Sequence, residues 1–197
     1  MSESSSAHLM SSPTGSVALR PVHARGDILP PYRGTPIGEL LRAHALRARI
    51  EAGAAPELLV VTCMDHRVRL SLPPGFAFEV RTAGACFEPV RSNIAFAVAV
   101  AGIRHLAIIG HTDCAMGVAH ERGGAMVDHL VSAEGWSPED AAAEHAGLCA
   151  GFALEEVMQT TLDRARELAR AFPSCLVAPL LYDVGEHALS QIETVDA

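Results

Sequence analysis

The sequence predicts an α/β fold with a mostly parallel sheet of about four to five strands, flanked by helices and preceded by an N-terminal arm or helix. Three short apolar runs, over residues 57–63, 76–82 and 105–111, have the length and composition of buried strands. A helix-like segment over 92–104 separates the last two runs. Strands that alternate with helices form parallel sheets covered on both faces, which gives the fold class.

The N-terminal region is expected to be an arm followed by a helix. Residues 1–34 are rich in Ser, Pro and Gly and lack apolar periodicity, which is typical of a flexible or extended arm. The next segment has apolar residues near helical spacing, with Thr35 as the N-cap, Pro36 at the first helical position and Gly53 at the end. We therefore divide the chain into an arm over 1–34 and a single α/β domain over 35–197 that carries the site.

The C-terminal third is expected to add one helix and two strands. The pattern loosens after residue 117 and resumes with an amphipathic helix over 153–172, which stops before Pro173. Two strands, over 175–184 and 188–195, follow it and are joined by a turn. We assign the charged residues of the helix to a solvated face, namely Glu155, Glu156, Asp163, Arg164, Arg166, Glu167 and Arg170.

Composition excludes several classes of function and partner. The net charge is −8, and all 15 basic residues are Arg. Nucleic-acid affinity depends on basic contacts to phosphate, so DNA and RNA are not expected partners. The absence of Lys removes Schiff-base chemistry and the P-loop lysine. The longest apolar run, over 94–103, is about half of the roughly 20 residues that a membrane span needs, so we expect no membrane partner.

The start of the chain and its cysteines indicate a reducing compartment. The first 15 residues lack the basic and apolar regions of a signal peptide, so we expect a cytoplasmic protein, free or inside a bacterial microcompartment. Five cysteines in a chain of this size do not suggest a disulfide framework. Disulfides are therefore not expected, and we assign three of the cysteines to apolar packing: Cys86, Cys149 and Cys175.

Metal-ligating side chains follow two of the predicted strands. Cys63 ends the first strand, and His111 and Cys114 follow the third, 48 positions later for His111. Parallel strands bring their carboxyl ends to one edge of the sheet, where ligands of α/β proteins collect. Two thiolates and one imidazole suit zinc, and three protein ligands with a fourth position open indicate a catalytic site. Taken singly, a strand-end Cys is most often a small buried hydrophobe, and the H-x-x-C spacing is common by chance.

Asp65 and Arg67 lie directly after the first of these ligands. A carboxylate and a guanidinium at positions i and i+2 point to the same side of an extended segment and can pair. The alternative is a surface salt bridge worth about 0 to 1 kcal/mol.

Three motifs in order resemble those of the β-class carbonic anhydrases, C-x-D-x-R, R-N-A-G and G-H-x-x-C. They are CMDHR at 63–67, RTAGA at 81–85 and GHTDC at 110–114. The resemblance extends over about residues 35–192. It implies a zinc enzyme in which Cys63, His111 and Cys114 bind the metal and Asp65 with Arg67 forms the catalytic dyad. The implied activity is the reversible hydration of CO2 to bicarbonate and a proton by zinc-bound hydroxide, which the dyad orients.

This sequence departs from the family pattern at several positions. Thr82 stands where Asn is usual, and Ala115 and Met116 replace a Gly-Gly or Gly-Met pair, which affects the pocket more than the metal. Both glutamines, Gln159 and Gln191, lie far downstream, so a Gln donor to substrate is not expected. In family members that lack this donor, the carboxylate of the dyad can occupy the fourth zinc position at low pH. The resemblance implies this second role for Asp65. The one Trp also lies well after the zinc motif, so no bicarbonate site of the non-catalytic kind is expected.

Two other functions and one assembly prediction stand beside this hypothesis. The same scaffold can hydrolyse COS or CS2, and spacing does not separate these substrates from CO2. A non-catalytic zinc-containing assembly subunit is the third alternative. The resemblance also implies a homodimer or higher homo-oligomer, with residues 20–52 reaching a partner subunit. The sequence does not identify a proton carrier: His66, His120, His129 and His145 lie near the motifs, but a structural or surface role is more common for any single His.

Overall fold

A computed structural model of the chain describes residues 16–51, 53–147 and 154–195. These residues form a six-stranded sheet in the order β1-β6-β5-β4-β2-β3. The inner strands β3, β2, β4 and β5 are parallel, whereas β6 and β1 run antiparallel to their neighbours. The predicted α/β class is thus confirmed. The strands are β1 (Ser16–Arg20), β2 (Leu58–Cys63), β3 (Ala77–Thr82), β4 (His105–His111), β5 (Leu176–Asp183) and β6 (Ala188–Val195).

The sheet has more strands than expected because part of the predicted arm joins it. From residue 16 onward the arm is described, and β1 pairs antiparallel with β6 from Ser16 opposite Val195 to Arg20 opposite Gln191. The Gln191 side chain secures the segment after β1, because its Oε1 accepts a hydrogen bond from Leu29 N at 2.7 Å. The division at residue 34 stays a prediction, and residues 1–15 lie outside the described part.

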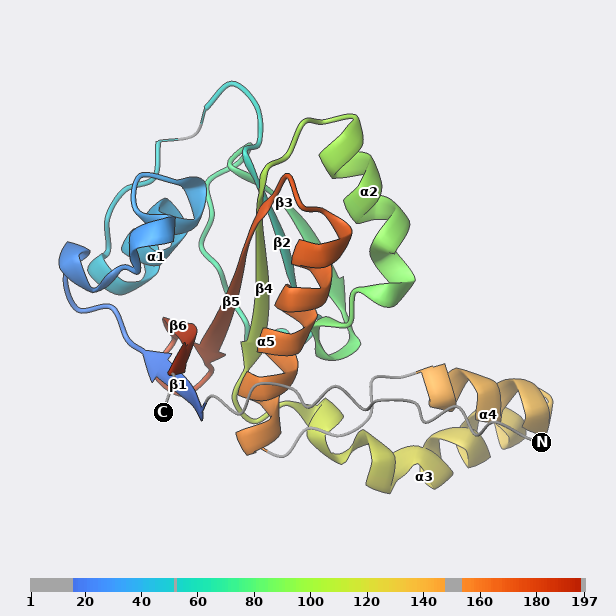
Figure 1. Cartoon of the computed structure of the whole chain (residues 1–197). Coiled ribbons are helices and arrows are strands. Elements are labelled where there is room, and N and C mark those ends of the chain that lie inside the picture. The colour runs from blue at the N-terminus through green and yellow to red at the C-terminus, as the bar shows by residue number, and fades with distance from the viewer. Residues whose placement is uncertain (1–15, 52, 148–153, 196–197) are drawn as a thin grey trace, which may run out of the picture.

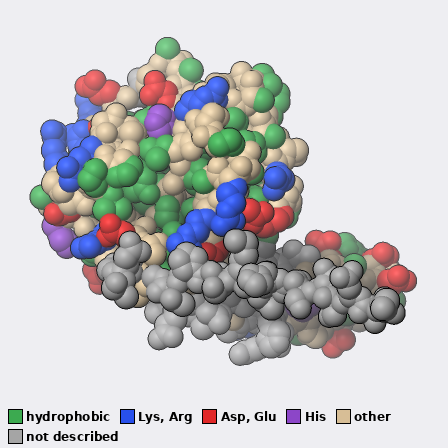
Figure 2. All heavy atoms as spheres, in the orientation of Figure 1, with side chains coloured by type: hydrophobic (Ala, Val, Ile, Leu, Met, Phe, Trp, Pro, Cys, Tyr) green, Lys and Arg blue, Asp and Glu red, His purple; other side chains and the backbone are tan. Residues whose placement is uncertain are grey.

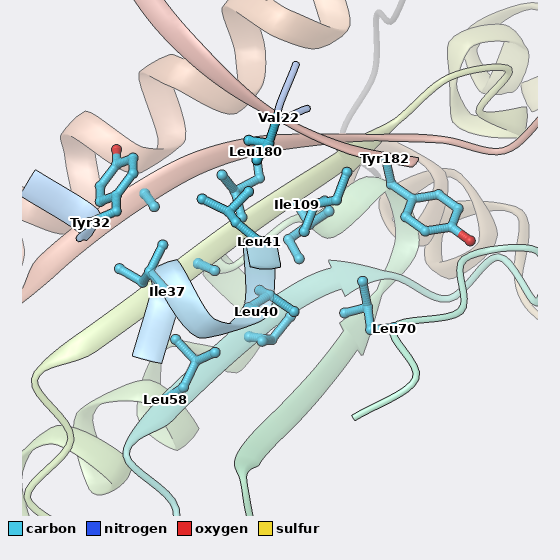
Figure 3. Close-up of a cluster of buried hydrophobic side chains, with 14 of the residues drawn as sticks. Val22, Tyr32, Ile37, Leu40, Leu41, Leu58, Leu70, Ile109, Leu180 and Tyr182 are labelled. Atoms are coloured by element: carbon cyan, nitrogen blue, oxygen red, sulfur yellow. The ribbon is translucent and has the colours of Figure 1, made fainter. Parts of the chain in front are cut away.

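Helices cover both faces of the sheet, as Figure 1 shows. Alternate residues of each central strand face opposite helices: Leu58 and Val60 pack toward α1, and Leu59 and Val61 toward α2 and α5. Figure 3 shows the α1 side, where Ile37, Leu40 and Leu41 meet side chains of the sheet. The helices are α1 (Pro36–Leu46), α2 (Arg91–Ala99), α3 (Ala119–Ser132), α4 (Pro138–Gly147) and α5 (Leu154–Ala171).

Helix α1 begins where the sequence predicts and ends earlier. The Thr35 hydroxyl accepts a hydrogen bond from Gly38 N at 3.3 Å, and Pro36 occupies the first turn. The expected end at Gly53 was wrong, because Arg47 already adopts a left-handed conformation with φ of 54° and ends the helix. A left-handed residue after the last turn is a common helix terminator, and Arg takes the place that Gly usually has.

The segment after residue 117 contains two helices where the sequence pattern loosens. Helices α3 and α4 form a hairpin that projects from the sheet (Figure 1), and acidic side chains lie at its outer end (Figure 2). Ser137 caps α4 by accepting a hydrogen bond from Asp140 N at 3.0 Å. Across residues 16–51, 53–147 and 154–195, no helix has both the length and the hydropathy of a membrane span.

Gly110 allows α5 to pack closely beside the metal-ligand end of β4. A Cβ at this position would clash with Thr161 Oγ1 and lie 3.3 Å from Val157 Cγ2. The Thr161 side chain is buried and donates a hydrogen bond to Val157 O at 2.7 Å, so it cannot move aside without losing this bond. We expect Gly110→Ala to lower the free energy of unfolding by about 1 to 3 kcal/mol, measured by urea unfolding.

The control for this change is Gly124→Ala on α3, where an added Cβ meets no atom within 4 Å. Ala is the better helix former, so this variant should keep or slightly raise stability. Equal stability of the Gly110→Ala protein and the wild type would show that α5 can shift away from β4.

Candidate metal centre

The three predicted metal ligands lie together at the carboxyl edge of the sheet. Cys63 is the last residue of β2 and His111 the last residue of β4, and these strands are direct neighbours. Cys114 returns to the same place after a tight turn in which Asp113 has a left-handed φ of 53°. The three ligand atoms all lie within 4.8 Å of one another.

The three donor atoms have the spacing that a zinc ion requires, and the imidazole has a lone pair available for the metal. The two sulfurs, Cys63 Sγ and Cys114 Sγ, are 4.0 Å apart. Zn–S bonds of about 2.3 Å at a tetrahedral angle would place two thiolates about 3.8 Å apart. His111 Nδ1 lies 2.9 Å from Thr112 O, which assigns the proton to Nδ1 and leaves the Nε2 lone pair available. Nε2 is buried without a hydrogen-bond partner among the described residues, so the residues fit the metal.

The hydrogen bond between the two thiols makes Cys63 the more acidic of the pair. The hydrogen bond with Cys114 lowers the pKa of Cys63, and the same bond raises the pKa of Cys114. Burial opposes a charge on His111, but its contact with Cys63 raises the pKa of the imidazole. The second thiol proton is therefore held tightly until a cation takes its place, and metal binding should release it.

Asp65 and Arg67 form a two-point ion pair beside these ligands. The Arg67 guanidinium donates from Nη2 to Asp65 Oδ2 at 2.7 Å and from Nε to Oδ1 at 3.1 Å. The backbone N–H of Arg67 also donates to Asp65 Oδ1, at 2.9 Å. These contacts hold the pKa of Asp65 well below its usual range, so the carboxylate stays ionised. The pairing is thus present, whereas its catalytic role stays a prediction.

Asp113 holds the same guanidinium from the other side and was not singled out from the sequence. Arg67 Nη1 donates to Asp113 Oδ2 at 2.5 Å, and Nη2 donates to Asp113 O at 2.7 Å. Asp113 lies between His111 and Cys114 in the turn, so the loop that brings the second sulfur also positions Arg67. Its place inside the H-x-x-C motif was the available signal, because any residue there must lie at the site.

A second residue missed by the sequence is Arg164 on α5. We expected it on the solvated face, and this was wrong, because its side chain is buried with 9% relative exposure. Its Nη1 donates to Gly84 O at 2.5 Å, in the loop after β3. Helical spacing places Arg164 on the same face as the buried Thr161 and Leu168, three positions before it and four after it, but this spacing does not reveal the contact with Gly84. Glu155 and Glu156 have side chains outside the described residues.

The remaining cysteines and histidines divide into described and undescribed groups. Cys86 is disulfide-bonded, so our expectation of no disulfides was wrong, whereas Cys175 is free and packs against the core under α2.

His66 lies beside the dyad, with Nδ1 3.9 Å from Asp65 Oδ1 and a side chain that is 89% exposed. His129 faces Glu134, and His145 packs against Gly123 within the α3–α4 hairpin. Cys149 and the side chain of His120 lie outside the described residues.

Comparison with known proteins agrees with this geometry. Residues 58–150 match the family model for carbonic anhydrase, and this range contains all five predicted site residues. A curated carbonic anhydrase from Pseudomonas aeruginosa is 35% identical over 94 residues, which is 42% of this chain and 42% of the relative. This chain is similar to the carbonic anhydrases over the segment that carries the three motifs. The resemblance predicted from the three motifs is confirmed.

Solved structures of the family share the fold. The carbonic anhydrase from Glaciozyma antarctica aligns with a TM-score of 0.56 and 21% identity, over 82% of this chain and 98% of that one. A carbon disulfide hydrolase aligns with a TM-score of 0.50 and 22% identity, over 77% of this chain and 85% of that one. The β-class carbonic anhydrase scaffold is thus common to proteins that act on different substrates.

Proposed function

We propose that this chain catalyses the reversible hydration of CO2 to bicarbonate and a proton, with zinc held by Cys63, His111 and Cys114. The observation that carries the proposal is the buried Nε2 of His111, which has no hydrogen-bond partner in the part of the chain that the structure describes, in a cluster with two sulfurs 4.0 Å apart. A purely structural zinc site usually has four protein ligands, whereas three leave a position open for chemistry. The match to the carbonic anhydrase family model and the similarity to a curated carbonic anhydrase support the same activity.

The protein groups around the metal position have distinct tasks in this reaction. Zinc, when bound, lowers the pKa of water from about 15.7 to about 7 and so supplies hydroxide near neutral pH. Asp65 is ionised and mostly buried, and its charge acts on both His111 and Cys114. It can accept a hydrogen bond from the attacking oxygen and thereby direct a lone pair toward the substrate carbon. Arg67 holds the carboxylate in place with bonds to both of its oxygens.

The test combines metal analysis with two gas substrates. We expect purified protein to contain close to one zinc per chain and to accelerate CO2 hydration in a stopped-flow pH-indicator assay. The alternative substrates, COS and CS2, are assayed by sulfide release with the same preparation. Sulfide release without CO2 hydration would overturn the proposed substrate. Metal-free protein in a zinc-supplemented preparation would overturn the metal centre itself.

We also propose that the active form is at least a homodimer. Large hydrophobic side chains are exposed on the single chain: Phe96 is 63% and Val100 68% exposed, and they lie one helical turn apart in sequence at the end of α2. The strand that precedes α2 in the chain, β3, lies at the edge of the sheet, and its outer side has no partner among the described strands. Edges and apolar faces of this kind are usually covered in assembled proteins. A monomeric mass in light scattering would contradict this proposal.

A further inference from the structure

Arg164 is a buried cation on the inner face of α5. It belongs to an inward-facing stripe with Thr161, Ala165 and Leu168, which are 2%, 3% and 0% exposed. A guanidinium is rarely buried unless its donors are used, because desolvation of a charge costs several kcal/mol. The position of Arg164 therefore calls for a specific role in what it contacts.

The contact of Arg164 leads directly to a metal ligand. Its Nη1 donates to the carbonyl of Gly84 at 2.5 Å. Gly84 lies in the short turn Ala83–Ala85 that follows β3 and has a left-handed φ of 62°. The backbone N–H of this same residue also lowers the pKa of the Cys63 thiol. One peptide unit on each side of Gly84 thus links the guanidinium to the first sulfur of the metal centre.

The turn that Arg164 contacts lies directly beside the end of β2. Cys63 is opposite Thr82 in the parallel register of β2 and β3, and Met64 N donates a hydrogen bond to Thr82 O at 2.9 Å. The backbone that follows Thr82, which Arg164 holds at Gly84, is thus adjacent to the residue that carries the first sulfur.

We propose that Arg164 is a positioning residue of the metal centre, which holds the turn at Gly84 against the end of β2 and so keeps Cys63 in place as a ligand. The proposal rests on the proposed zinc site and assigns to it a residue from the far end of the chain. Residues that orient metal ligands typically contribute 10- to 100-fold in metal affinity.

The test measures metal binding on the full-length protein and does not depend on activity. Three variants are compared with the wild type: Arg164→Met, Arg164→Lys and the control Arg166→Met. Arg166 lies two residues further on the same helix and pairs with the exposed Asp163. Zinc affinity is measured by competition with a chelator, and the thiolate-to-cobalt absorption band is recorded after substitution with Co²⁺. A thermal melt of each variant shows that it is folded.

We expect Arg164→Met to weaken zinc binding about 10- to 100-fold and to shift the cobalt band. Arg164→Lys should lose affinity less, because it keeps the charge but lacks the planar donor fork. Arg166→Met should stay within about twofold of the wild type with an unchanged band, as an exposed pair contributes little. A residue with only a packing role would lower the melting temperature and leave the cobalt band in place.

The proposal is overturned if folded Arg164→Met binds zinc within about twofold of the wild type and its cobalt band is unshifted. That result would leave the proposed zinc site intact. If Arg164→Met does not fold, Arg164→Lys decides: a several-fold loss with a shifted band supports the proposal, and wild-type behaviour overturns it. A wild-type protein that binds neither zinc nor cobalt overturns the proposed function together with this inference.

Discussion

Replacing Cys63 with Ser is expected to abolish stoichiometric zinc binding and to lower CO2 hydration at least about a hundredfold. A serine hydroxyl is a poor zinc ligand, and two remaining donors cannot hold the ion against free water. Without zinc, the pKa of water near the site returns toward about 15.7, so hydroxide becomes scarce at neutral pH. Zinc content by elemental analysis and the rate of CO2 hydration measure the two effects separately.

Stability provides an independent readout of the same change. A ligand that binds only the folded state stabilises it by about 2.7 kcal/mol at a hundred times its dissociation constant. Zinc should therefore raise the melting temperature of the wild type and leave that of Cys63→Ser unchanged. The matched control is Cys175→Ser, since Cys175 is a free cysteine that donates to Ile103 O at 3.6 Å near the opposite end of β4. A Cys63→Ser protein with full zinc and full activity would refute the ligand assignment.

The strands and the ligand cluster could be predicted because each depends on local pattern and on one general rule of topology. The apolar run that forms β4 begins and ends where expected, at His105 and His111. Neighbouring parallel strands must end at the same edge, so Cys63 and His111 had to meet once both strands were recognised. The prediction of a zinc site then followed from the residue types alone.

Features that depend on distant partners could not be predicted in the same way. The strand β1 exists because Ser16–Arg20 finds β6 near the other end of the chain, and its own sequence has little strand pattern. Arg164 can be buried because its guanidinium donates a hydrogen bond to a carbonyl of the turn after β3, 80 positions earlier in the sequence. Tertiary hydrogen bonds of this kind override the solvent preference of a charged residue.

Helix ends show the same division between local and tertiary signals. The start of α1 was set by Thr35 and Pro36, which act within one turn. Its end was misplaced because Arg47 takes up a left-handed conformation that the residue type does not favour. No Gly or Asn near Arg47 provides a local signal for this break.

Asp65→Asn is expected to keep the zinc and to lower CO2 hydration by about two orders of magnitude. Asn has the same shape and keeps one oxygen acceptor, but it lacks the charge that Arg67 holds beside the metal position. Because Asp113 grips Arg67 independently, the guanidinium should stay in place and the effect should report on the carboxylate itself. A misdirected nucleophile typically costs about a hundredfold in rate.

Asp113→Asn is the matched control, because it changes the other carboxylate on the same guanidinium. Asp113 is 77% exposed, and its backbone carbonyl still accepts a hydrogen bond from Arg67 in the variant. An exposed charge pair contributes little, so this protein should retain most of its activity. A non-catalytic zinc module would show no difference between wild type, Asp65→Asn and Asp65→Ala. Such a result would reduce the pair of Asp65 and Arg67 to a structural salt bridge, even with zinc bound.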